Sequence, residues 1–170
     1  MLSHIQIYKK SDEINCIFHI HNADIISVAT NKNGLLPLTQ SSSLIINKIK
    51  YLKYSGIFNK EEIDDLKNLN LTENDNIILL ENHGAFIFHN TIPKTFNILR
   101  HLINSCVAQN KILSTTNNLE NLILIDDKII NNQEKYSSKT YQSIDLNELI
   151  YDSYLRKYLI NYYENGELRF

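Results

Sequence analysis

The apolar residues of this chain fall into short continuous runs and longer helical stripes that follow one another along the sequence. Short runs rich in Ile, Phe and Leu predict strands at 14–21, 76–80 and 85–88, and alternation around Tyr51 predicts another at 45–54. Helical spacing and capping residues predict helices at 2–10, 25–30, 39–44, 60–66, 91–114 and 146–163. Strands that alternate with helices indicate a mixed α/β layered fold.

Three of these helices have recognisable starts. Asn22 and Asn59 are the predicted N-caps of the helices at 25–30 and 60–66. Asn90 or Thr91 begins the longest helix, where Pro93 falls in the first turn and is tolerated.

Residues 115–141 are polar and rich in asparagine, apart from one apolar burst at 122–125. We expect an irregular connection there, with room for one strand or short helix. The chain therefore divides into a core, residues 1–114, and a C-terminal part, residues 115–170. The second part consists of this connection and a helical tail that lies across the domain or a partner subunit.

A chain of 170 residues is long enough for one domain with a buried core. Its 17 basic and 19 acidic residues are spread without blocks, so charge predicts neither a nucleic-acid nor an acidic-membrane partner. No run reaches the ~18 apolar residues of a membrane span, and no secretory signal is visible. Cys16 and Cys106 belong to no CxxC pair, so we expect two buried, reduced thiols. These features predict a soluble cytoplasmic domain.

Two histidines, His19 and His21, occupy alternate positions in the first predicted strand. Side chains alternate between the faces of a strand, so both imidazoles share a face with Ile17, while Phe18 and Ile20 occupy the other. Two histidines at a strand end are more often polar groups without a ligand. Here, however, both leave a strand that is otherwise apolar.

A third histidine, His83, precedes Gly84, where the backbone can turn tightly and let a neighbouring strand approach closely. Three imidazoles converging on one point would make a divalent-metal site with an open position for substrate or water. Burying them without a ligand would need three sets of hydrogen-bond partners. We therefore predict that His19, His21 and His83 bind a metal. The remaining histidines lack this context and are expected at the surface or at caps: His4, His89 and His101.

Histidine pairs of this spacing also occur in unrelated metalloenzymes. A metal-dependent hydrolase barrel needs about 250 residues, which this chain does not have. A cupin carries such a pair followed by a carboxylate, which Asp24 roughly mimics. Cupins, however, are glycine-rich all-β barrels, whereas this chain has four glycines and a long predicted helix.

Three segments together resemble the class II aldolase/adducin head domain family. They are Ile17-Phe18-His19-Ile20-His21, Gly34-Leu35-Leu36-Pro37-Leu38-Thr39-Gln40 and Leu79-Leu80-Glu81-Asn82-His83-Gly84. The likeness continues through 93–109 and covers residues 1 to about 113. Neither the histidine pair nor the Asn-His-Gly turn is specific alone, but the combination is. Within the family, the chain is most similar to short, adducin-like bacterial proteins of unassigned activity.

The resemblance implies a three-layer α/β/α sandwich around a largely antiparallel central sheet, usually assembled as a tetramer. In the sugar-phosphate aldolases and epimerases of the family, two strand histidines and the Asn-His-Gly histidine bind zinc. Carried over residue by residue, these are His19, His21 and His83. The metal polarises substrate oxygens and stabilises an enediolate. Histidine itself suits several metals, so zinc is implied by the resemblance alone.

The chain also departs from the aldolase pattern. The family's proton-transferring glutamate would fall just before Met1, its phosphate-binding loops lie further upstream, and its interface tyrosine would fall near Gln40. We therefore assign no catalytic residue and expect the chain to lack the N-terminal part of the domain. Such a loss should expose a sheet edge that pairs with a second copy or with a separately encoded N-terminal fragment.

Two functions remain open at this point. The first is metal-dependent aldolase or epimerase chemistry on a small sugar phosphate or hydroxy-carbonyl compound, impaired by the absent segment. The second is a non-catalytic, adducin-head-like module for oligomerisation or interaction. An in-frame glutamate encoded immediately upstream of Met1 would favour the enzyme.

Overall fold

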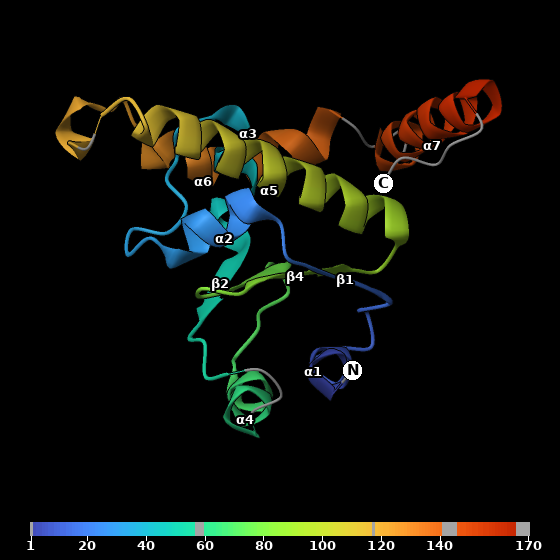
Figure 1. Cartoon of the computed structure of the whole chain (residues 1–170), viewed down its shortest axis with the longest axis horizontal. Helices are drawn as coiled ribbons and strands as arrows, with labels where there is room; N and C mark the ends of the chain where they lie inside the picture. The colour runs from blue at the N-terminus through green and yellow to red at the C-terminus, as the bar shows by residue number, and fades with distance from the viewer. Residues whose placement is uncertain (1, 57–59, 117, 141–145, 166–170) are drawn as a thin grey trace.

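The structure is a computed structural model of the chain, and it describes residues 2–56, 60–116, 118–140 and 146–165, without the side chains of 134–140 and 160–165. Figure 1 shows a central sheet with helices on both faces. The elements in chain order are α1 (Leu2–Tyr8), β1 (Cys16–Ile20), α2 (Ala23–Thr30), α3 (Gln40–Ile45), η1 (Ile46–Lys48), β2 (Ile49–Leu52), α4 (Lys60–Asn68), β3 (Ile77–Leu80), β4 (Gly84–His89), α5 (Ile92–Leu113), η2 (Leu119–Asn121), α6 (Asp127–Thr140) and α7 (Leu146–Asn165).

The four strands lie in the order β1-β4-β3-β2. The pairs β1–β4 and β3–β4 are antiparallel, whereas β2 and β3 are parallel. Helices α1 and α4 cover one face of this sheet, and α2, α3 and α5 cover the other (Figure 1). The predicted three-layer α/β/α arrangement with a largely antiparallel sheet is therefore confirmed.

Alternation along β3 builds a separate core on each face of the sheet. Ile78 and Leu80 pack with Ile7 of α1 and Leu66 of α4, whereas the neighbouring positions of β3 pack with α2 and α5. All four residues of β3 are at most 1% exposed. Each such side chain contributes roughly 1.5–3 kcal/mol through removal of apolar surface from water. The central strand thus fixes both helical layers.

Capping residues place the helices largely where the sequence predicts them. The Asn22 side chain accepts from Asp24 N and Ile25 N and begins α2. A capping box between Thr39 and Ser42 begins α3. The Thr91 hydroxyl accepts from Lys94 N and begins α5, with proline in its first turn. Asn59, the predicted cap of α4, lies outside the described residues.

Two predicted segments differ from the structure. The strand predicted at 45–54 is only Ile49–Leu52, because α3 and the 3-10 turn at Ile46–Lys48 take up its start and its partner β3 is itself only four residues long. The connection at 115–141, predicted to be irregular with room for one strand or short helix, contains the 14-residue helix α6. Its Ile130 is 5% exposed, so tertiary packing stabilises a helix that composition alone does not favour.

None of the helices in the described ranges is long and apolar enough to cross a membrane. Cys16 and Cys106 are both buried and unbonded, as predicted.

Candidate metal centre

The three predicted ligands meet at one edge of the sheet. Strands β1 and β3 both run antiparallel to β4, so their carboxyl ends lie at the same edge. His19 lies in β1, His21 follows its end, and His83 lies in the turn between β3 and β4. One nitrogen from each ring lies within 4.8 Å of the other two. The structure thus brings together all three residues that the sequence singled out.

The turn that carries His83 needs two unusual backbone positions. Asn82 has a φ of 57°, a left-handed conformation that asparagine tolerates better than most residues. Gly84 has a φ of 156°, and a Cβ there would collide with the carbonyl oxygen of Ile20 and lie 3.1 Å from Cδ2 of His21. Glycine is therefore required so that β1 and its histidines can approach the turn closely.

His19 is the most enclosed of the three predicted ligands. Its ring stacks on Phe86 with centroids 4.2 Å apart, on the face that α1 and α4 cover. Its Nδ1–H donates to the carbonyl oxygen of Ala85 across 3.2 Å, which leaves Nε2 as the free lone pair. Burial, with smaller contributions from the neighbouring histidines, lowers the pKa of His19 to about 4 despite this bond. The ring is therefore neutral at pH 7, as a metal ligand must be.

His21 and His83 form the open side of the centre. Their Nε2 atoms are 3.0 Å apart and their rings are stacked with centroids at 4.8 Å. Two imidazoles on one tetrahedral zinc ion, each bonded at about 2.0–2.1 Å, would place their nitrogens about 3.3 Å apart. Burial lowers the pKa of His83 and the charge on His21 lowers it further, whereas Glu62 raises it. The donor set fits a divalent metal ion, and the spacing of the His21 and His83 nitrogens is close to that of two ligands on one ion.

Three neighbours of the centre were not identified from the sequence. The Tyr54 ring lies edge-on to His83 at 5.5 Å. His4, expected at the surface or at a cap, instead packs edge-on against His19 at 6.0 Å and Phe86 at 5.3 Å. Glu62 of α4 is a buried carboxylate near His83. No local pattern marks these residues, because the proximity of His4 and Glu62 depends on how α1 and α4 pack against the sheet, and that of Tyr54 on the pairing of β2 with β3.

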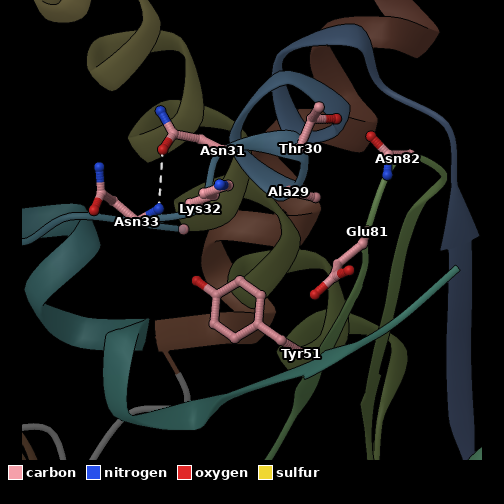
Figure 2. A pocket seen from close by; sticks show the side chains of 9 residues that line it. Ala29, Thr30, Asn31, Lys32, Asn33, Tyr51, Glu81 and Asn82 are labelled. Atoms are coloured by element: carbon pink, nitrogen blue, oxygen red, sulfur yellow. Dashed lines mark hydrogen bonds between the residues drawn. The ribbon is translucent and has the colours of Figure 1, made fainter.

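The turn at 81–84 also borders a separate cavity of about 450 Å³. Figure 2 shows Tyr51 and Glu81 beside the loop 30–34, with Asn33 N donating to the Asn31 side chain. Tyr51 stays in place because its hydroxyl accepts from Leu35 N at 2.8 Å. None of the three histidines lines this cavity, so it is distinct from the metal centre.

Fold and site together define a mixed α/β domain with a three-histidine centre at one sheet edge, and comparison with known proteins gives its family. Residues 1–110 match the model of the class II aldolase and adducin N-terminal domain. The chain belongs to the class II aldolase/adducin family, as the sequence predicted.

Curated relatives include members of the adducin group. The chain is 32% identical over 125 residues to the protein hu-li tai shao of Drosophila melanogaster and 30% identical over 123 residues to alpha-adducin of Rattus norvegicus. These matches cover 74% and 72% of this chain. They cover only 10% and 17% of the two relatives, so the chain spans a small part of their length.

Solved structures with the same fold include aldolases. An aldolase II superfamily protein from Pseudomonas syringae superposes with a TM-score of 0.75 at 20% identity, covering 92% of this chain and 60% of that one. L-fuculose 1-phosphate aldolase from Glaciozyma antarctica PI12 gives a TM-score of 0.68 at 20% identity, covering 99% of this chain and 60% of that one. At these identities the likeness establishes the fold.

Proposed function

We propose that His19, His21 and His83 bind a divalent metal ion, most favourably zinc. We further propose that the domain performs aldolase- or epimerase-type chemistry on a small sugar phosphate or hydroxy-carbonyl compound. The convergence of three imidazoles, with one nitrogen of each within 4.8 Å of the others, carries this proposal. Family membership supports it, and so does the fold shared with a protein named L-fuculose 1-phosphate aldolase.

The roles of the chain's own residues follow from the geometry. His19 would be the fixed ligand, because Ala85 sets its tautomer and Phe86 supports its ring. His21 is exposed and would keep the centre open to substrate. A bound divalent ion would polarise the carbonyl and hydroxyl oxygens of the substrate. Among the described residues no carboxylate joins the three-histidine group, so the proposal names no catalytic base.

An aldol-cleavage assay tests the enzymatic part of this proposal. Protein reconstituted with zinc is incubated with a ketose 1-phosphate, and release of dihydroxyacetone phosphate is followed. We expect turnover that a chelator abolishes, that zinc restores and that His83→Ala removes. Turnover that persists in chelator or in the variant would contradict it.

A second candidate is a non-catalytic module for self-association, and the surface of α7 favours it. Leu149, Tyr158 and Leu159 are at least half exposed although they are large and apolar. A helix with apolar residues outside its packed face commonly contacts another subunit.

Light scattering coupled to size-exclusion chromatography separates the two candidates when it is combined with the cleavage assay. The self-association module predicts an oligomer that forms equally with and without metal and lacks turnover. A monomer at all concentrations would eliminate it.

A further inference from the structure

Glu62 is an unusual member of the helix that carries it. Acidic residues in the first turn of α4 complement the helix dipole, and such residues normally remain in water. Its neighbours Asp64 and Asp65 are exposed, but Glu62 is only 7% exposed. A buried carboxylate is costly unless it is paired or hydrogen-bonded. Its burial therefore calls for partners within the layer that α1 and α4 form.

One partner of Glu62 is a hydroxyl from α1. Ser3 Oγ donates to Glu62 Oε1 at 3.2 Å and joins the two helices. The other end of the layer is tied separately, because Lys10 Nζ donates to the carbonyl oxygens of Lys67 and Leu69 at 2.6 and 2.7 Å. A carboxylate offers about four acceptor positions, so a single serine bond leaves Glu62 with spare capacity.

His83, in contrast, has a ring nitrogen without a hydrogen-bond partner. Its Nδ1 is buried and has no hydrogen-bond partner among the described residues. When Nε2 of an imidazole binds a metal, Nδ1 carries the proton and needs an acceptor. His19 already has such an acceptor in Ala85 O. Helix α1 ties Glu62 to the same side of the sheet, because Ser3, which binds Glu62, precedes His4, whose ring lies 6.0 Å from that of His19.

We infer that Glu62 is a positioning residue of the metal centre: in the metal-bound state it accepts the Nδ1–H of His83, directly or through one bridging water. The carboxylate then fixes the tautomer and the orientation of the ring, and it makes Nε2 a stronger electron-pair donor to the metal. Ser3 holds the carboxylate in place through Oε1. This inference rests on the proposed metal site and adds the residue in α4 that completes it.

The test is a zinc titration of metal-free protein against a competing chelator, with Glu62→Gln and Glu62→Leu beside the wild type. Removing an outer hydrogen-bond partner of a ligating histidine typically lowers metal affinity about 10- to 100-fold. We expect about 10-fold weaker binding for Glu62→Gln, which keeps the shape but not the charge. We expect a larger loss for Glu62→Leu, which also lacks an acceptor and suits a buried site.

Two controls separate positioning from a structural role. Asp65→Asn removes a charge from an exposed position of the same helix and should leave zinc affinity unchanged. Ser3→Ala breaks the bond between α1 and α4 but keeps the carboxylate, so it should lower thermal stability and weaken zinc binding less than Glu62→Leu does. In zinc-loaded wild type, nitrogen-15 NMR should show a slowly exchanging Nδ1 proton on His83, and Glu62→Leu should make its exchange faster.

The outcomes are distinct. Weaker binding in both Glu62 variants with normal binding in Asp65→Asn supports the inference. Wild-type affinity in both Glu62 variants overturns it and leaves the proposed metal site intact. Absence of zinc binding in the wild type overturns the metal site itself and this inference with it.

Discussion

The Nε2 atoms of His21 and His83 lie 3.0 Å apart, although 62 positions separate the two residues in the chain. Strand β4 brings them together, because it pairs with β1 on one side and with β3 on the other. The same arrangement places His19 beside both rings. The geometry of the centre therefore depends on the pairing of these strands and on the turn at 81–84, which joins β3 to β4 and carries His83.

Gly84→Ala should damage both the fold and the centre. The added Cβ would collide with Ile20 O at a φ that alanine rarely adopts, so we expect unfolding to become easier by about 1–3 kcal/mol. We also expect weaker zinc binding, because β1 must move away from the turn. Urea denaturation and zinc titration measure the two effects.

Asn82→Gly is the matched control in the same turn. Glycine relieves the left-handed backbone of Asn82 but loses more chain entropy on folding, so the net change should stay within about 0.5 kcal/mol. Equal damage from both substitutions would show that the turn is sensitive to any change, and would refute the specific role of Gly84.

The two hydrogen bonds between the Gln109 side chain and the backbone of the loop 34–36 should contribute strongly to the stability of the fold. Gln109 is 1% exposed; its Nε2 donates to Gly34 O at 2.8 Å and its Oε1 accepts from Leu36 N at 2.7 Å. Gln109→Leu would leave both backbone groups without these partners and should cost roughly 2–4 kcal/mol of unfolding free energy. Lys111→Met, at an exposed position of the same helix, should change it by less than about 0.5 kcal/mol. A loss below 1 kcal/mol by urea denaturation would contradict this role for Gln109.

His101 should make the metal-free protein less stable in acid. Burial, with help from Arg100 and Lys48, lowers its pKa from 6.5 to about 4. Between these two pH values the unfolded chain binds a proton that the folded chain does not, so the free energy of unfolding falls as pH falls. This contribution is complete above pH 6.5 and is lost progressively toward pH 4.

Urea denaturation in chelator at several pH values tests this effect. His101→Gln keeps a polar side chain without a titrating ring, so its free energy of unfolding should depend less steeply on pH between 4 and 6.5. A slope equal to that of the wild type would show that His101 does not contribute.

Local patterns predicted the parts of the fold that local chemistry controls. Thr91 and Pro93 marked the start of α5, and Asn22 marked the start of α2, because capping depends on the nearest few residues. Helix α6 could not be predicted in the same way. Its packing against α3, which includes the bond from Ser43 Oγ to Gln133 Oε1, spans 90 positions.

The candidate site likewise contains residues that local patterns predicted and residues that only long-range packing brings together. His19 and His21 share a face because of strand alternation, and the glycine that follows His83 marked the turn that carries it to a neighbouring strand. Glu62, Tyr54 and His4 carry no motif: the packing of α1 and α4 on the sheet brings His4 and Glu62 to the centre, and Tyr54 follows strand β2. The sequence therefore predicted the three histidines that converge, but not the residues around them.

The three-histidine metal centre is tested most directly by the zinc content of the purified protein. The protein is dialysed against zinc, its bound zinc is measured by mass spectrometry, and isothermal titration gives the affinity. We expect one ion per chain in the wild type and in His101→Gln, whose ring lies outside the centre. We expect loss of the ion in the alanine variants of the three ligands: His19→Ala, His21→Ala and His83→Ala. A wild type without zinc, or equal zinc in wild type and ligand variants that remain folded, would contradict the proposed metal centre.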